Sequence, residues 1–275
     1  MTNSQSRLIS SIVLILGVLF VFFLGKMAAK ITFFVMFAIV LDEILVNFKH
    51  KKRSEVDYLI SFAGYIIGAF FIISASLNSY ILYSNLIYVL LTLLSLSIFS
   101  NNIFFLIRNS KLFLSIIRYS LFLLPLFPLL AFCYIIDYEN WRLYLALVLS
   151  IGAISDSLGW IVGKYWGKHK LYPKVSPNKT IEGALGAVAG CGLVISSYLY
   201  ITAEKSPVAL FIVFSFLAAI GVLGDLWQSR LKRLFKLKDS SKLIPGHGGV
   251  YDRLDSHIFI VPFFLQILLI FPHFL

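Results

Sequence analysis

Four polar side chains near residue 230 share one face of a predicted helix. They are Asp225, Ser229, Lys232 and Arg233. Their spacing of i, i+4, i+7 and i+8 places them on the same side of an α-helix. Asp225 follows a long apolar run, where an unpaired carboxylate is costly unless it has a function. Together these groups suit a site for a metal ion and a polyanion, although a helix-packing ion pair of Asp225 with Arg230 or Lys232 would also explain that carboxylate.

The segment after this helix combines glycines, carboxylates and basic residues. Its candidates for binding phosphate or metal are Lys238, Asp239, Gly246, His247, Gly248, Gly249, Asp252, Arg253 and Asp255. Glycine lets the backbone approach a ligand closely and offer its N–H groups to phosphate oxygens. Magnesium takes one or two carboxylates plus substrate phosphates. Asp225 and Asp252 could supply those carboxylates. The simpler alternative is an ordinary turn in a basic, lipid-facing loop, but such a loop needs neither a histidine between glycines nor several carboxylates.

A second polar segment, residues 176–183, leads into another apolar run. Thr180 is predicted to be the N-cap of the helix that follows, and Glu182 complements its positive first turn. Lys179 beside a helix N-terminus is a natural phosphate clamp. The alternative is a capping motif with a solvated lysine.

Further acidic and glycine residues lie inside apolar runs. Asp156 is one of them, and a polar cluster bonded between helices is the alternative to a functional role. Asp42 and Glu43 could neutralise Arg118 or a nearby loop base, and the residues themselves assign them no further. Four glycines predict close helix packing or a dimer seam: Gly183, Gly186, Gly190 and Gly192.

The composition shows that membrane helices must position these groups. Of 275 residues, 59% are hydrophobic and 13% charged, and the mean hydropathy is +0.89. Soluble domains have about 45–50% apolar and about 25% charged residues, so an ordinary soluble, disordered or disulfide-rich protein is excluded. A net charge of +11 would suggest nucleic acid in a soluble protein, but here basic loops set topology and no nucleic-acid partner is predicted. We predict an all-α polytopic bundle of about nine transmembrane helices.

Nine apolar segments can be marked along the chain. They cover residues 8–25, 31–48, 58–77, 80–106, 112–136, 142–163, 181–201, 208–229 and 257–275. With the N-terminus inside, the inside loops carry most of the 24 Lys and Arg residues, as cytoplasmic loops do. This orientation places loops 164–180 and 230–256 on the cytoplasmic face. We predict two regions of the chain: residues 1–140, with about five transmembrane helices, and a C-terminal catalytic region at residues 141–275.

The positions from Ser229 onward form one long pattern. They are Ser229, Leu231, Lys232, Arg233, Lys238, Asp239, Ser241, Ile244, Pro245, His247, Gly248, Gly249, Val250, Asp252, Arg253, Leu254 and Asp255. This pattern resembles the signature of the phosphatidate cytidylyltransferases, also called CDP-diacylglycerol synthases. Residues 176–183 are similar to a second block of that family. The region of Asp156 resembles a third, although Leu158-Gly159 departs from its small-residue pattern. The resemblance covers roughly the C-terminal half of the chain.

The resemblance implies a reaction in which CTP and phosphatidate give CDP-diacylglycerol and pyrophosphate, with Mg²⁺ and with a second cation left open. The implied metal ligands are Asp225 and Asp252, with Asp156 as a further candidate. The implied catalytic residues are Asp225, Asp252, Lys232, Arg253 and Lys179. The implied substrate-binding residues are Ser176, Asn178, Ser229, Arg233, Lys238, Asp239, Gly246, His247, Gly248, Gly249 and Asp255. The implied setting is the bacterial inner membrane, with the site facing the cytoplasm, bilayer lipid as a partner and homodimerisation left open.

Two other functions stay open on the residues alone. A CTP-dependent lipid kinase would use the same metal and basic loops, but it needs a general base, for which His247 or Asp239 could serve. A non-enzymatic transporter would need a charged path across the membrane. Transporter folds usually show inverted repeats, which are not evident in this sequence, and its charges gather at one face.

Overall fold

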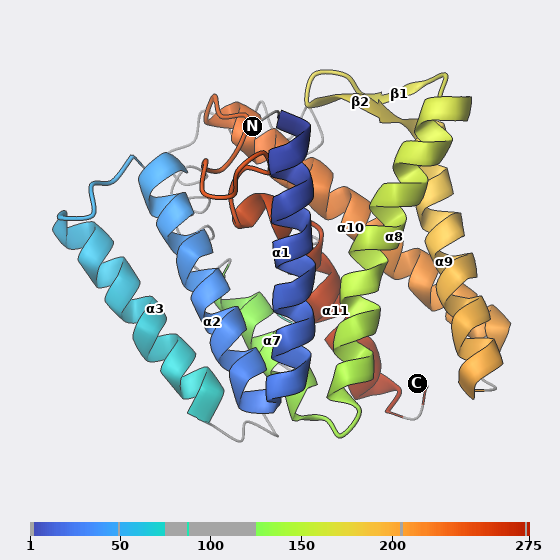
Figure 1. The fold of residues 1–275 in the computed structure, drawn as a ribbon, viewed down its shortest axis with the longest axis horizontal. Coiled ribbons are helices and arrows are strands. Elements are labelled where there is room, and N and C mark those ends of the chain that lie inside the picture. Colours follow the sequence, from blue (N-terminus) through green and yellow to red (C-terminus); the bar gives the residue numbers. More distant parts are fainter. Residues whose placement is uncertain (1–2, 49, 75–86, 88–124, 204–205, 273) are drawn as a thin grey trace. The chain divides into compact units, whose positions relative to one another are not determined.

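The computed structural model describes residues 3–48, 50–74, 87, 125–203, 206–272 and 274–275, and its regular structure is almost entirely α-helical (Figure 1). Within these described residues, five helices are long and apolar enough to cross a membrane: Lys26–Phe48, Val56–Ile73, Trp141–Trp166, Ile181–Ala203 and Pro207–Leu234. The prediction of an all-α polytopic membrane protein is therefore confirmed. The count of nine helices and the inside N-terminus stay predictions. Most of the fourth and fifth predicted segments, and Arg118 with them, lies outside the described residues.

The chain forms two compact units. Unit 1 is Met1–Arg142 with Phe235–Leu254, and unit 2 is Leu143–Leu234 with Asp255–Leu275. Unit 1 contains α1 (Asn3–Leu24), α2 (Lys26–Glu43), the π-helix η1 (Ile44–Phe48), α3 (Val56–Ser74), α7 (Leu126–Asp137) and the 3-10 helix η3 (Tyr251–Arg253). Unit 2 is built from α8 (Trp141–Trp166), β1 (Lys170–Tyr172), β2 (Ser176–Thr180), α9 (Ile181–Ala203), α10 (Pro207–Leu234) and α11 (His257–Ile270). The loop after α10 thus packs with the N-terminal helices.

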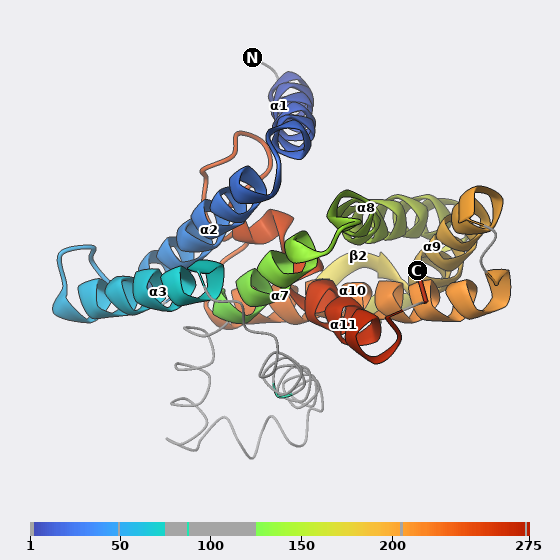
Figure 2. The ribbon, with the colours of Figure 1, turned by 90° about the horizontal axis from the view of Figure 1, so that it is seen from below.

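Helices α2, α3 and α7 pack together in unit 1 (Figure 2). The rings of Phe33 and Phe132 stack with their centroids 3.9 Å apart, and Phe37 is fully buried beside them. Lys30 of α2 forms an ion pair with Asp137 at the end of α7, with 2.7 Å between Nζ and Oδ1. Helix α2 starts at Lys26, before the predicted boundary at residue 31, and the pair gives the buried Lys30 ammonium the partner that such a charge needs.

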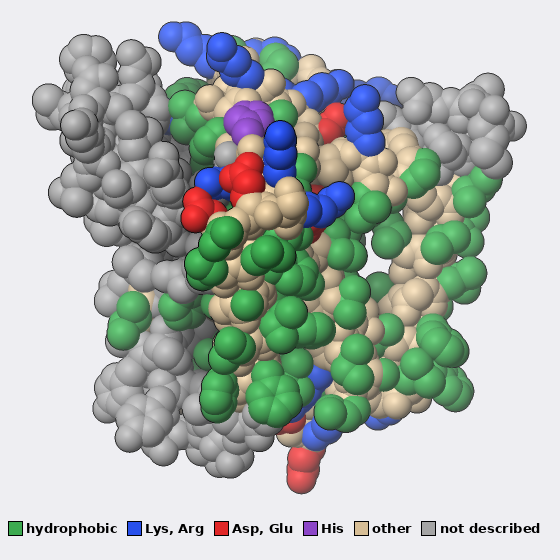
Figure 3. Space-filling view, turned by 90° about the vertical axis from the view of Figure 1, so that its left-hand side faces the viewer, with side chains coloured by type: hydrophobic (Ala, Val, Ile, Leu, Met, Phe, Trp, Pro, Cys, Tyr) green, Lys and Arg blue, Asp and Glu red, His purple; other side chains and the backbone are tan. Residues whose placement is uncertain are grey.

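The surface of α1 is that of a lipid-facing helix. Val13, Leu16 and Phe20 are each about three-fifths exposed. On the face drawn in Figure 3, many hydrophobic side chains lie between an upper group of charged side chains with a histidine and a few charged side chains at the lower edge. Such a surface is stable against lipid tails and would be unfavourable in water.

Unit 2 contains a hairpin that the sequence analysis did not predict. Strand β2 pairs antiparallel with β1, whereas the sequence predicts residues 176–183 only as a polar segment that leads into a helix. The helix start itself is confirmed, because the Gly183 N–H donates a hydrogen bond to Thr180 Oγ1 at 3.1 Å. The last predicted segment is too long, since α11 ends at Ile270.

The predicted close packing at glycines is confirmed where α8 meets α9. A Cβ added at Gly183 would lie 2.7 Å from the backbone oxygen of Gly159. A Cβ added at Gly186 would lie 2.5 Å from a methyl carbon of Val162. Because the two backbones approach this closely, only glycine fits at these positions.

We expect Gly183→Ala to lower the melting temperature of the protein in detergent. The added methyl group would collide with a backbone atom, and overpacking typically costs about 1–3 kcal/mol. Gly17→Ala in α1 is the matched control, since a Cβ at Gly17 meets nothing within 4 Å. A thermal-shift measurement that gives both variants the wild-type value would contradict the packing role of Gly183.

Candidate active site

Asp225 of α10 is paired with Lys179 of β2. The Lys179 ammonium forms an ion pair with Asp225 Oδ2, and Ser229 Oγ donates a hydrogen bond to Asp225 Oδ1 at 3.3 Å. The predicted common helix face of Asp225 and Ser229 is therefore present. The side chains of Asp225 and Lys179 are 19% and 31% exposed, so water shields the pair only partly. A carboxylate able to hold a cation thus contacts an ammonium able to hold a phosphate.

Arg230 fastens the hairpin to α10. Its guanidinium group donates a hydrogen bond to Tyr172 Oη at 3.0 Å and lies 5.7 Å from the centre of the Tyr172 ring. Arg230 is only 8% exposed, so this contact is shielded from solvent. It ties β1 to the helix that carries Asp225, and the pairing of β1 with β2 then fixes the strand that carries Lys179.

Two further carboxylates lie in unit 2, and one of them, Asp255, is influenced by the other and by Asp225. Asp156 is exposed on α8, and Asp255 lies just before α11 with its Oδ1 accepting a hydrogen bond from the Ser256 N–H at 2.8 Å. Burial, together with the negative charges of Asp225 and Asp156, raises the pKa of the Asp255 carboxyl well above its usual range. Lys232 opposes this effect with its positive charge. The charges of Asp225 and Asp156 thus add to the larger effect of burial, and three carboxylates share this part of unit 2.

This crowding fits a hard divalent cation. Among the described residues no three His, Cys, Asp or Glu side chains form a ready ligand set. Mg²⁺ does not require one, because it keeps several waters and usually takes one or two carboxylates plus substrate phosphates. Carboxylate oxygens are the ligands that it prefers, and a cation beside Asp225 would relieve the repulsion that Asp255 experiences.

Asp252, the second predicted metal ligand, organises the loop of unit 1. Its Oδ2 atom accepts hydrogen bonds from the Ser240 N–H at 2.7 Å, the Ser240 hydroxyl at 2.9 Å and the Gly249 N–H at 2.9 Å. Gly248 has a φ of +84°, and a Cβ there would lie 2.6 Å from the same oxygen. These two glycines therefore let the backbone approach a carboxylate, while nucleotide binding by this segment stays a prediction.

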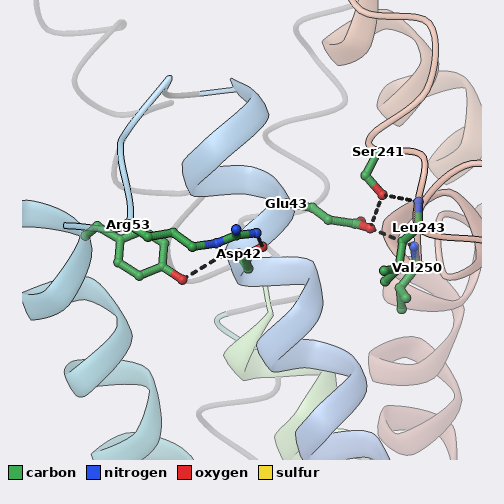
Figure 4. A network of polar contacts seen from close by, with 7 residues as sticks. Asp42, Glu43, Arg53, Ser241, Leu243 and Val250 are labelled. Carbon is green, nitrogen blue, oxygen red and sulfur yellow. Dashed lines mark hydrogen bonds and ion pairs between the residues drawn. The ribbon is translucent and has the colours of Figure 1, made fainter. Parts of the chain in front are cut away.

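Glu43 at the end of α2 belongs to the polar cluster of unit 1, and its residue type alone gave it no role. Its Oε1 atom accepts hydrogen bonds from Ser241 Oγ at 2.7 Å and the Val250 N–H at 3.0 Å (Figure 4). Its Oε2 atom accepts from the Tyr251 N–H at 2.9 Å and lies 3.1 Å from Ser240 Oγ, whose single proton it shares with Asp252 Oδ2. In the sequence it is an acidic residue inside an apolar run, and the resemblance to the cytidylyltransferases extends to an acidic residue such as Glu43 in the second span.

His247 contacts the first helix. Its Nδ1 atom lies 2.6 Å from Ser10 Oγ, and its Nε2 atom lies 3.3 Å from Ser11 Oγ. Ser10 Oγ also donates a hydrogen bond to the Pro245 carbonyl at 3.1 Å. Both ring nitrogens thus have partners in unit 1, and the predicted role of His247 in substrate binding stays a prediction.

The remaining candidates differ in their access to a substrate. Exposed residues are Arg233, Lys238, Asp239, Gly246, Arg253 and Asn178, and partly buried residues are Lys232 and Ser176. The exposed cations Lys238 and Arg253 lie where phosphate groups from solvent or from a lipid surface can reach them.

The fold and these residues define a polytopic membrane protein with two polar clusters, one around Asp225 in unit 2 and one around Asp252 in unit 1. The cytidylyltransferase family matches residues 5–271, nearly the whole chain, and the chain belongs to this family.

Among the relatives are three bacterial proteins named phosphatidate cytidylyltransferase. The chain is 42% identical to the protein of Bacillus subtilis (strain 168) over 119 residues, which cover 42% of this chain and 44% of the relative. It is 43% identical to that of Staphylococcus aureus (strain COL) and 40% identical to that of Staphylococcus saprophyticus subsp. saprophyticus. Each of these two alignments spans 129 residues, 46% of this chain and 49% of the relative. The chain thus spans about half the length of the curated relatives it matches.

We expect Lys179→Gln to lower cytidylyltransferase activity by about 10- to 100-fold. This is the loss in rate that corresponds to the free energy of one hydrogen bond between charged groups. Lys174→Gln is the matched control, because Lys174 is an exposed lysine in the turn of the same hairpin. Initial rates of both purified variants measure the difference. Equal activity of the two would contradict a role for Lys179 in the site.

Proposed function

We propose that this protein is a phosphatidate cytidylyltransferase, which converts CTP and phosphatidate to CDP-diacylglycerol and pyrophosphate. The contact between Lys179 and Asp225 carries the proposal, because it joins a phosphate-binding cation to a metal-binding carboxylate beside a membrane helix. Membership of the cytidylyltransferase family and the names of the relatives support the same reaction.

The proposed reaction needs charge neutralisation more than it needs acid–base catalysis. A phosphate oxygen of phosphatidate bonds to the α-phosphorus of CTP, while the bond from that phosphorus to the β-phosphate oxygen breaks and pyrophosphate leaves. The attacking oxygen is already anionic, so no side chain has to remove a proton. Two like charges 4 Å apart repel by about 4 kcal/mol at an effective dielectric constant of about 20, and several such pairs must be brought together.

The basic residues of the two clusters are suited to offset this repulsion. Those that we assign to phosphate binding are Lys179, Lys232, Arg233, Lys238 and Arg253. Arginine can bind a phosphate through two parallel hydrogen bonds, whereas lysine acts as a point charge on a flexible stem. The acyl chains of phosphatidate can stay in the bilayer while its head group reaches these side chains.

Asp225 and Asp252 are our proposed ligands of Mg²⁺, with Asp156 as a further candidate. When bound, Mg²⁺ would neutralise phosphate charge and align the triphosphate for attack at its α-phosphorus. Lys179 then has a second task, because it balances the charge of Asp225 when no cation is there. Asp239 is our candidate for a contact with a second cation or with one of the lysines.

The charge distribution supports a site on the cytoplasmic face of a bacterial inner membrane. When the N-terminus is inside, most basic residues fall in loops on the same side of the membrane. These loops include residues 164–180, which contain β1 and β2, and residues 230–256, which follow α10. CTP is a cytoplasmic nucleotide, so this orientation gives both polar clusters access to it.

We expect label from [α-³²P]CTP to enter the lipid phase when the protein is reconstituted with phosphatidate and Mg²⁺. Label from [γ-³²P]CTP should leave as pyrophosphate, because the bond beyond the α-phosphorus breaks. Removal of Mg²⁺ by EDTA should abolish transfer, and added Mg²⁺ should restore it. Entry of the γ-label into an added lipid alcohol would instead indicate a kinase, and no transfer by folded protein would reopen the transporter alternative.

We expect Asp225→Asn and Asp252→Asn each to abolish turnover without preventing membrane insertion. Asparagine keeps one acceptor oxygen, so the hydrogen bonds to Asp252 Oδ2 can persist while the negative charge is lost. Activity per folded molecule, with insertion checked by membrane extraction, is the measurement. Near-normal activity of either purified variant would reject its assignment as a metal ligand.

A further inference from the structure

We propose that Glu43 is a positioning residue that holds the signature loop, defined here as residues 238–252, in its active conformation. The proposal rests on the proposed function, which assigns Asp252 of this loop to the metal. Glu43 itself belongs to α2, a membrane helix far from the loop in sequence. It lies outside the C-terminal motif and has no assigned role in the reaction.

The burial and the hydrogen bonds of Glu43 carry the proposal. Glu43 is only 2% exposed, and a buried carboxylate is stable only where other donors replace water. All four donors described above come from the signature loop, two near its start and two near its end. The Glu43 carboxylate therefore holds both ends of the signature loop against α2. Its negative charge strengthens the hydrogen bonds that do so.

The backbone on both sides is adapted to this contact. A Cβ at Gly249 would collide with Glu43 Oε1 and with Ser240 Oγ, so glycine is required for the approach. Immediately after Glu43, α2 changes into the π-helix Ile44–Phe48. Single π-helical turns are often found at functional sites, where they redirect side chains.

Ser240 links Glu43 to Asp252. Its fully buried hydroxyl group lies 3.1 Å from Glu43 Oε2 and 2.9 Å from Asp252 Oδ2. Its N–H donates to the same Asp252 oxygen at 2.7 Å. A shift of Ser240 would thus move the carboxylate that we assign to the metal, so Glu43 acts on the reaction through Asp252.

Asp42 provides a matched control on the same turn of α2. Its carboxylate points away from the loop and accepts hydrogen bonds from Arg53 and from Tyr58, at 2.7–2.9 Å (Figure 4). Asp42→Asn therefore removes a charge from the same helix end without touching the signature loop.

The kinetic test compares Glu43→Gln with Asp42→Asn in the reconstituted protein. Glu43→Gln should raise the Mg²⁺ concentration for half-maximal activity by about tenfold or more. Mutation of a residue that supports a metal ligand through hydrogen bonds typically lowers metal affinity or activity by about 10–100-fold. The KM for phosphatidate should stay within about twofold, and Asp42→Asn should leave both quantities unchanged. If Glu43→Gln lowers only the yield of folded protein, or matches Asp42→Asn in Mg²⁺ dependence, the proposal is overturned.

A second measurement does not depend on activity. Hydrogen–deuterium exchange of the wild type should show the amides of Val250 and Tyr251 protected, and Glu43→Gln should raise their exchange while the hairpin of unit 2 stays unchanged. Unchanged exchange at these amides would overturn the proposal. If the wild type transfers no cytidylyl group, the proposed function fails, and the exchange result still decides whether Glu43 holds the loop.

Ser240→Ala tests the route of the effect. Because Glu43 is inferred to act on Asp252 through Ser240, the double variant Glu43→Gln/Ser240→Ala should lose no more than about threefold beyond the worse single variant. Independent, multiplicative losses would show that Glu43 does not act through Ser240.

Discussion

A carboxylate that is buried against membrane helices must be matched by donors or by opposite charge, and both units are arranged around this constraint. In unit 2 the match for Asp225 is the ammonium of Lys179. In unit 1 the matches for Glu43 and Asp252 are hydroxyl and backbone N–H groups of one loop. The cost of leaving such a charge unmatched is several kcal/mol, which is comparable to the whole stability of many proteins.

The two ways of matching charge suit different tasks. An ion pair between flexible side chains can open when a cation and a phosphate compete for its members, so Asp225 and Lys179 are available to ligands. Hydrogen bonds from a folded backbone are harder to exchange, so Glu43 gives a fixed support. Unit 2 thus offers exchangeable groups and unit 1 a rigid support, and precise placement of phosphates needs both properties.

The sequence predicted local features of the site better than distant ones. The helix face shared by Asp225 and Ser229, the cap at Thr180 and the tight packing at Gly183 follow from spacing within one or two turns of helix. The partner of Glu43 could not be predicted, because Ser240 lies 197 residues away and periodicity carries no information over that distance. The hairpin was missed because its strands are short and polar, without the alternating pattern of longer strands.

The separation between Glu43 and its donors also affects how the protein is made. Tyr251, one of these donors, follows Glu43 by 208 residues. At about 5–20 residues per second, translation reaches it roughly 10–40 s after Glu43 has been synthesised. For most of that interval, until Ser240 is synthesised 197 residues after Glu43, none of the four donors exists, so the carboxylate at the end of α2 needs another partner, such as water. Completion of the signature loop is then the event that lets this helix end become buried, and a chain truncated before residue 240 would keep a charged helix end that a quality-control protease can recognise.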